Sequence, residues 1–197
     1  MRSAGVRHET SSWYEQLEAL YSHPDRHYHN FRHITDCLSE FDSVRDFSHQ
    51  PVPVEFAIWF HDAIYDPRAL DNEERSATLA KQCIAETCRN ARLGESVAQL
   101  VLATKLHDGS LHFDAPLLVD IDLSILGQPA DRFWEYETQI RREYEWVPKK
   151  VFSEKRAEIL QRFLSRKTIY NSEHFVEKYE RQARLNLMAS LQKLRRG

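Results

Sequence analysis

A histidine and an aspartate stand side by side directly behind one of the most apolar stretches of this sequence. His61 and Asp62 follow residues 54–60, which read VEFAIWF and are almost wholly apolar. A stretch that is apolar on every side is typical of a helix in the protein interior. Burying either ionisable group without a partner costs on the order of several kcal/mol. We therefore expect a hydrogen-bond donor, a counter-charge or a metal ion to meet these two side chains.

Two histidines lie earlier in the chain, within the segment YHNFRHI. His29 and His33 are four residues apart, and Phe31 and Ile34 continue an apolar stripe beside them. Four residues make about one turn of a helix, so both imidazoles are predicted to project from one side of it. One or both could face a site. A histidine beside an apolar stripe is, however, more often a hydrogen-bonded core or surface residue.

Two aspartates interrupt the apolar segment VDIDLSIL. Asp120 and Asp122 are two residues apart, which is roughly 200° of rotation on a helix, so they cannot both point at the same ion. One is expected to be a ligand and the other a cap, a hydrogen-bond acceptor or a solvent-facing group. A buried salt bridge with an arginine is the alternative for either of them.

Taken together, these pieces resemble the H…HD…D pattern of the HD superfamily of metal-dependent phosphohydrolases. The pattern falls here on His33, His61, Asp62 and Asp122. Longer blocks strengthen the resemblance to a predicted HD-type hydrolase group, and they read RHYHNFRHI, WFHDAIYDPRALDNEERSA, DIDLSILG and IRREYEWVP. These blocks extend over about residues 20–190. The resemblance implies a helical HD-type domain whose four ligands hold a divalent cation, with Asp120 as the alternative fourth ligand.

The chemistry of this ligand set supports such a site independently of the resemblance. Two neutral imidazoles and two carboxylates give a net charge near zero once a divalent cation is bound. Nitrogen ligands favour Mn, Fe, Co, Ni or Zn, with Mg as a further option. Four protein ligands leave positions for a water and a phosphate oxygen, and a water activated there is the candidate nucleophile. Asp62 is therefore predicted to serve both the metal and catalysis.

The predicted reaction is hydrolysis of a phosphomonoester or phosphodiester by attack of metal-bound water, with a nucleotide as one expected substrate class. The alternative is a non-catalytic protein in which the same ligands hold a metal or a nucleotide for regulation. A third interpretation is a helical adaptor whose basic last helix contacts a partner. The sequence does not decide between one metal and two, although we favour one.

Further side chains are candidates for contact with a phosphorylated substrate. Phosphoryl transfer needs positive charge near the non-bridging oxygens, and Arg26, Lys105 and Arg141 are the cations nearest the motifs. His107 is predicted to touch the substrate phosphate or to cap a helix. Asp66 is predicted to act as general acid for the leaving group, or to cap the helix that follows. Each cation is equally suited to a surface ion pair.

The elements that must position these residues are predicted to be helices throughout. Apolar positions recur at helical spacing, and no β alternation of comparable length appears. We therefore expect one compact all-α domain over residues 1–197, with about eight or nine helices. Apolar stripes in the N-terminal part of the chain predict two helices. Further helices are expected at 54–60, 76–84, 97–104, 117–126, 133–146, 154–164 and from 174 onward.

Composition and charge limit the partners. The formal net charge is -3, yet from Val151 onward eleven Lys and Arg face five Asp and Glu. Without a Lys/Arg block or aromatic interleaving, this basic stretch is more often a solvated face, so nucleic acid is not an expected partner. The expected ligand is a small phosphorylated molecule. The apolar stripe of the last helix makes a homo-oligomer compatible with the sequence.

The cysteines and the hydropathy pattern indicate a cytoplasmic protein. Cys37, Cys83 and Cys88 form no C-x-x-C motif, and their odd number without a signal sequence favours a reducing compartment. No run approaches the ~20 apolar residues needed to span a bilayer, and the N-terminus lacks the apolar core of an export signal. No membrane partner is expected.

Overall fold

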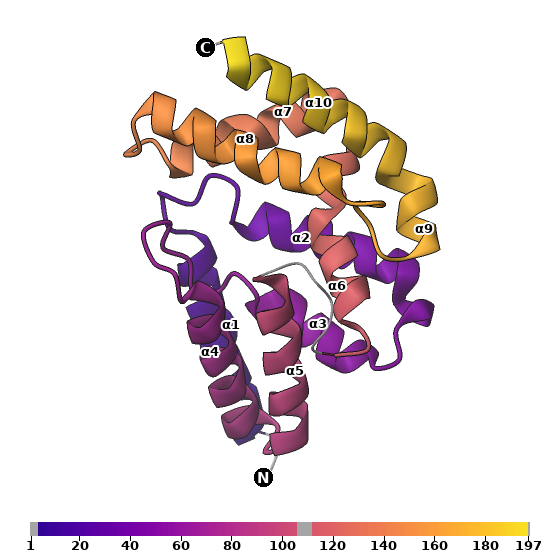
Figure 1. The fold of residues 1–197 in the computed structure, drawn as a ribbon. Helices are drawn as coiled ribbons and strands as arrows, with labels where there is room; N and C mark the ends of the chain where they lie inside the picture. Colours follow the sequence, from indigo (N-terminus) through magenta and orange to yellow (C-terminus); the bar gives the residue numbers. More distant parts are fainter. Residues whose placement is uncertain (1–3, 106–111, 197) are drawn as a thin grey trace. The chain divides into compact units, whose positions relative to one another are not determined.

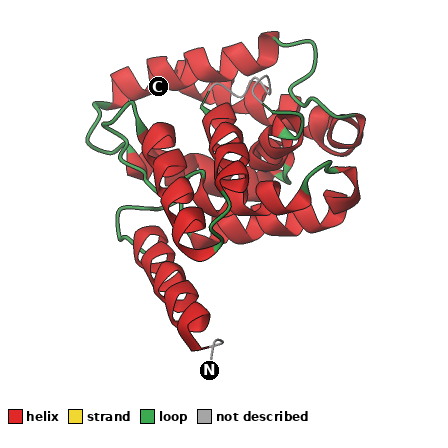
Figure 2. Cartoon of the chain, turned by 90° about the horizontal axis from the view of Figure 1, so that it is seen from below, coloured by secondary structure: helices red, strands yellow, loops and turns green. Residues whose placement is uncertain are grey.

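The computed structural model describes the backbone of residues 4–105 and 112–196, and side chains from residue 12 onward within these ranges. All regular elements in the described ranges are helical (Figure 2), so the predicted all-α fold is confirmed. Nine helices of eight or more residues lie there, in agreement with the predicted eight or nine. None of the described helices combines the length and the apolar character that crossing a membrane requires.

The chain divides into two compact units, Met1–Val119 and Asp120–Gly197. The single domain over residues 1–197 stays a prediction. The first unit contains five helices and the 3-10 helix η1: α1 (Ala4–Tyr21), α2 (Phe31–Val44), η1 (Arg45–Phe47), α3 (Pro51–Phe60), α4 (Asn72–Thr87) and α5 (Ala91–Thr104). Helix α3 packs against α2, α4 and α5, while α4 and α5 run side by side (Figure 1).

Helix α3 is the core of this unit. Val54, Ala57 and Ile58 have no exposed surface, as the predicted buried helix requires. Helices α2, α4 and α5 together cover several of its sides, which explains why almost every position of α3 is apolar. The helix ends at Phe60, and the next residue, His61, is its C-cap. The first of the chemically interesting side chains therefore lies at the end of a helix that packs against three neighbouring helices.

A buried aspartate fixes the other end of α3. The Asp114 carboxylate is 1% exposed and accepts hydrogen bonds from the backbone N–H groups of His49 and Gln50, each at 2.8 Å. Pro51 occupies the first helical position, where the missing N–H costs no hydrogen bond. Because α3 carries His61 at its far end, Asp114 also helps to set the position of that imidazole.

The boundary between the units falls within α6 (Ala115–Asp122), and the second unit continues from there. Its further elements are the 3-10 helix η2 (Leu123–Gly127), α7 (Ala130–Glu143), α8 (Lys149–Ser165), α9 (Glu173–Phe175), the π-helical η3 (Val176–Glu180) and α10 (Arg181–Arg196). Helix α10 packs against α8 and η2 (Figure 1).

The predicted α-helix over 117–126 is shorter in the structure, because the chain tightens into η2 after Asp122. The Asn186 side chain donates hydrogen bonds to the carbonyls of Leu126 at 2.9 Å and Gln128 at 2.8 Å. These carbonyls are thus bound by α10 rather than by a continuing helix. A side chain 60 residues away decides this local conformation.

The predicted helix over 133–146 also ends early, at Glu143. The Arg141 guanidinium folds back and donates hydrogen bonds to the carbonyls of Tyr144 and Val147, the latter at 3.0 Å. Pro148 follows and cannot donate a backbone hydrogen bond. The turn between α7 and α8 is therefore closed by a side chain of α7 itself.

Two buried glycines provide a test of this packing. A Cβ at Gly127 would overlap the Cβ and ring of Tyr179, whereas a Cβ at Gly94 in α5 would meet its nearest neighbours at an ordinary 3.8 Å. We expect Gly127→Ala to lower the free energy of unfolding by about 1–3 kcal/mol. Gly94→Ala should leave it unchanged or raise it by about 0.5–1 kcal/mol, because alanine favours the helix. Urea denaturation of both variants checks this, and equal effects would contradict it.

Candidate metal centre

Three of the four predicted metal ligands converge in the first unit. The Nε2 atoms of His33 and His61 are 3.1 Å apart, and the Asp62 Oδ2 atom lies 3.5 Å from His33 Nε2 and 3.2 Å from His61 Nε2. Both imidazoles are buried, while Asp62 keeps 20% of its side-chain surface exposed. These three side chains form a group that could hold a metal ion.

The separations fit a divalent transition metal. Imidazole and carboxylate ligands bind such ions at about 2.0–2.2 Å, and coordination angles of about 90–109° then place neighbouring ligand atoms about 2.8–3.6 Å apart. All three observed separations fall within this interval. Two imidazole nitrogens and a carboxylate oxygen facing one another also repel unless a proton or a cation lies among them. The donor set therefore suits a positive ion on both geometry and charge.

The tautomer of His61 is set by the backbone of α3. Its Nδ1 atom lies 2.9 Å from the carbonyl oxygen of Ile58, an acceptor, so Nδ1 carries the proton and donates. The Nε2 atom that faces the group is left with its lone pair in the neutral ring. Metal-binding histidines commonly orient their rings in this way. On His33, the corresponding Nδ1 lies 3.7 Å from the Cys37 Sγ atom, one turn along α2.

Helix α2 begins later than the spacing of His29 and His33 suggested. The Asn30 side chain caps the helix by accepting a hydrogen bond from the Arg32 N–H at 2.9 Å, and α2 starts at Phe31. His29 therefore precedes the helix, and the prediction that both histidines project from it is wrong. The two rings nevertheless remain neighbours, with centroids 6.1 Å apart.

His29 instead belongs to the rim of the group. Its ring stacks on Tyr65, with centroids 4.1 Å apart and an interplanar angle of 27°. Its proximity to Asp62 also lowers the pKa of that carboxyl. His29 is thus the functional candidate of this segment to which sequence reasoning assigned no definite role.

The Asp62 carboxyl is held in its ionised form. Burial acts to raise its pKa. In the metal-free protein with protonated imidazoles, the charges of His61 and His29 and hydrogen bonds from His33 and His61 outweigh burial and hold the pKa well below its usual range. A carboxylate that stays ionised keeps its oxygens as acceptors or metal ligands. The electrostatics of the group therefore agree with its geometry.

Arg26 holds the turn that carries His61 and Asp62. Its guanidinium is 9% exposed and donates hydrogen bonds to the carbonyls of Asp62 at 2.6 Å, Ala63 at 2.7 Å and His29 at 3.1 Å. The contact joins the two segments that supply the group. The observed role of Arg26 is thus to position the backbone, and its role in substrate binding stays a prediction.

The two aspartates of α6 differ in their surroundings. Asp120 has no exposed surface, and its carboxylate accepts hydrogen bonds from the backbone N–H groups of Asn171 and Ser172 at 2.7 Å and from the Asn171 amide at 2.9 Å. Burial raises its pKa although these bonds favour the ionised form. Asp120 is therefore the aspartate that anchors a loop, here the one before α9.

Asp122 ends α6 and is half-buried. It belongs to the second unit, whereas His33, His61 and Asp62 belong to the first. Its place as the fourth ligand therefore stays a prediction. The Asp120 oxygens already accept three hydrogen bonds from the loop before α9, which argues against Asp120 as the ligand.

The structure ties Lys105 to the loop before α4. Its ammonium group donates to the carboxylate of Glu74 and to the Leu70 carbonyl, the latter at 2.7 Å. The hydrogen bond with Glu74 raises the pKa of Lys105. These contacts link the end of α5 to the start of α4. Its role toward a phosphate stays a prediction, and His107 lies outside the described residues.

Asp66 is exposed and sits in a polar turn. Its Oδ1 atom accepts from the Arg68 N–H at 2.9 Å, and its backbone N–H and carbonyl bind the side chain of Asn72, the first residue of α4. Asp66 thus shapes the turn that leads into the helix, close to its predicted capping alternative. The general-acid role stays a prediction.

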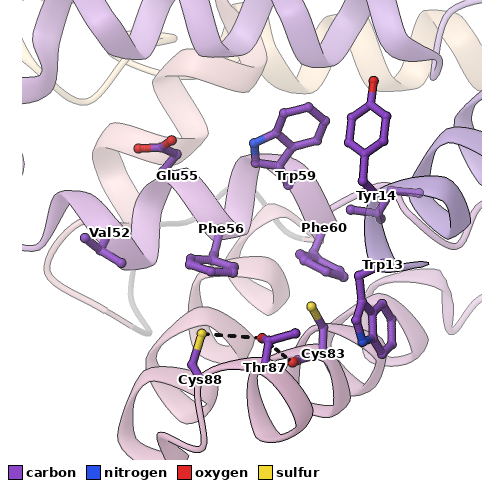
Figure 3. Close-up of a pocket in the computed structure, with 11 residues that line it drawn as sticks. Trp13, Tyr14, Val52, Glu55, Phe56, Trp59, Phe60, Cys83, Thr87 and Cys88 are labelled. Atoms are coloured by element: carbon purple, nitrogen blue, oxygen red, sulfur yellow. Dashed lines mark hydrogen bonds between the residues drawn. The ribbon is translucent and has the colours of Figure 1, made fainter. Parts of the chain in front are cut away.

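The first unit also contains a hollow that lies apart from the candidate metal ligands. It measures about 610 Å³ and lies among α1, α3 and α4, with a lining that is mostly apolar. Figure 3 shows Phe56 and Phe60 projecting from α3 toward Cys83, Thr87 and Cys88. None of the predicted ligands lines it. The candidate metal centre is therefore recognised by its converging donor atoms and not by the size of a cavity.

Comparison with protein-family models, curated proteins and solved structures found no match for this chain. The resemblance of its sequence blocks to the HD superfamily therefore stays a prediction. The functional argument rests on the arrangement of the side chains themselves.

The low pKa of Asp62 predicts a pH-dependent stabilisation of the metal-free protein. Its folded pKa lies below the unfolded value of about 3.9, so the stabilisation is fully present above that value and is lost as the pH falls through the folded pKa. We expect Asp62→Asn to lower the free energy of unfolding at about pH 6. The gap to the wild type should narrow from about pH 5 to about pH 3 in urea denaturation of metal-stripped protein. A gap that stays constant would contradict it.

Proposed function

We propose that this protein is a metal-dependent phosphohydrolase that cleaves a phosphomonoester or phosphodiester, with nucleotides as the favoured substrate class. The observation that carries the proposal is the convergence of His33 Nε2, His61 Nε2 and Asp62 Oδ2 at 3.1–3.5 Å from one another. Such a set of nitrogen and oxygen donors is suited to Mn, Fe, Co, Ni or Zn, with Mg as a further option.

The residues of the proposed site have different roles. His33, His61 and Asp62 would hold the cation, with Asp122 as the fourth ligand. A divalent ion bound there supplies a Lewis acid that polarises a phosphoryl oxygen and activates a water. The protein holds these ligands in position, because Arg26 binds the backbone of the turn and the Ile58 carbonyl orients the His61 ring.

Proton transfer and phosphate binding require side chains beyond the ligands. Hydrolysis of a phosphoester needs a proton for the departing alkoxide, and Asp66, four residues after Asp62, is the proposed donor. Lys105 and Arg141 are proposed to neutralise the non-bridging phosphate oxygens, and each would first exchange part of its present hydrogen bonding. Arg26 already binds three carbonyls, so its proposed contribution is mainly to position the ligands.

The proposal is tested by elemental analysis of protein purified without chelator, followed by a phosphatase screen. The screen includes nucleotides and generic phosphoesters with added Mn, Co, Ni or Mg. We expect close to stoichiometric metal and release of phosphate or nucleoside from at least one substrate. Metal without turnover would favour the alternative, a metal- or nucleotide-binding regulatory protein. Absence of stoichiometric metal would remove both.

Replacing Asp62 tests whether this residue itself is a metal ligand. Asp62→Ala is expected to lower bound metal to below about one tenth of the wild-type content and kcat/KM by at least about 100-fold, because it removes a ligand of the proposed ion. Helical content by circular dichroism should be unchanged. Asp66→Ala is the matched control, since Asp66 is exposed and four residues away. It should retain metal while its kcat falls, because Asp66 is the proposed proton donor, so it is a control for metal content only. Full metal in Asp62→Ala would contradict the proposal.

Substitutions of the two aspartates of α6 should affect different properties, folding stability for Asp120 and metal binding for Asp122. Asp120→Ala leaves three N–H donors without their acceptor and is expected to lower the free energy of unfolding by about 3 kcal/mol or more. Asp122→Ala is expected to weaken metal binding at least ten-fold, because it removes the proposed fourth ligand. Urea denaturation and metal titration distinguish the two. Metal loss confined to Asp120→Ala would show that Asp120 is the ligand.

A further inference from the structure

The second unit contains a hollow of about 380 Å³ whose lining differs from that of the apolar one. Helix α7, the first turn of α8 and the C-terminal part of α10 enclose it. Three basic side chains, Arg141, Lys149 and Lys193, come from three different helices and belong to its lining. This volume lies within the range of about 300–1,000 Å³ that is typical of small-ligand sites.

The charge balance of this lining favours an anion. Among the lining residues, one carboxylate, that of Glu137, faces the three basic side chains. Glu137 is itself paired with the buried guanidinium of Arg156 and accepts a hydrogen bond from the Ser190 hydroxyl at 2.8 Å. The negative charge of Glu137 is therefore largely compensated by Arg156 and Ser190. Cations gathered in a concave site raise the local concentration of anions.

Two aromatic rings add a second kind of contact. Lys193 Nζ lies 4.5 Å from the centroid of the Trp134 ring, and the Arg141 guanidinium carbon lies 4.8 Å from that of Phe152. Each ring is thus paired with a cation in the same wall. A base that stacks on the Trp134 ring would displace Lys193 from that face, and the freed ammonium would be available to bind the phosphate. Such stacking tolerates any base, as on single-strand binding proteins. Hydroxyls of Thr138 and Ser153 also line the hollow.

We propose that this hollow binds a nucleoside phosphate, with the phosphate among Arg141, Lys149 and Lys193 and the base against Trp134. A phosphate alone would leave the aromatic wall unused, and a free base would leave the cations unused. The enclosed volume suits one nucleotide rather than a strand of nucleic acid. The site does not use the candidate metal centre. It assigns Arg141 to this hollow, in place of the contact with a phosphate at the metal centre proposed above.

The proposal is tested by calorimetric titration of the full chain in the presence of chelator, so that the metal centre plays no part. The probes are AMP, ADP, adenosine and inorganic phosphate. We expect AMP or ADP to bind with a measurable Kd, at least ten-fold tighter than adenosine or phosphate. Tryptophan fluorescence should change on binding, and the change should be lost in Trp134→Phe.

Matched variants locate the site. Lys193→Gln removes an exposed cation and is expected to weaken nucleotide binding about ten-fold, as loss of one charge-assisted contact does. Lys178→Gln is the control, because Lys178 also lies over a tyrosine ring, that of Tyr179, but does not line the hollow. It should bind like the wild type. Equal Kd values for Lys193→Gln and the wild type, tight binding of oligonucleotides alone, or no binding of either nucleotide would overturn the proposal.

Discussion

The mutual repulsion of three electron-rich atoms is the constraint on which the candidate centre depends. The Nε2 atoms of His33 and His61 and the Oδ2 atom of Asp62 lie 3.1–3.5 Å apart, in a place from which most water is excluded. Such an arrangement is stable only if positive charge lies among them, as protons on the rings or as a cation. The rest of the first unit can be understood as the framework that keeps these atoms together.

That framework is built around α3. Its apolar surface is covered by neighbouring helices, so the helix has little freedom to shift, and it delivers His61 and Asp62 from its C-terminal end. Asp114 fixes the start of α3, and Arg26 binds the backbone just after its end. A buried carboxylate and a buried guanidinium thus hold the two ends by charge-assisted hydrogen bonds, which are stronger than neutral ones.

The same physics distinguishes structural from chemical carboxylates. Asp114 and Asp120 are both buried, and their oxygens accept backbone N–H groups from distant loops. Asp62 instead faces imidazoles, which can gain a proton or bind a metal ion. A buried aspartate in an apolar segment therefore indicates a partner, but the type of partner decides whether the residue acts in chemistry or in folding.

The sequence by itself determined the helical class and the approximate helix positions, because helical periodicity is a local property of the chain. It also indicated His61 and Asp62 as candidates, since ionisable residues behind an apolar run need partners. The choice of His33 came from the resemblance to the HD pattern. Only the tertiary structure decided that Arg26 binds carbonyls, that Asp114 binds the backbone just before α3, that His29 precedes α2 and that η2 replaces the end of a predicted helix. Each of these depends on atoms brought together from distant parts of the chain, and no local pattern encodes such a meeting. Asp114 directly precedes an apolar helix, so its local sequence predicts a cap of that helix and not the bonds to His49 and Gln50 that the structure shows.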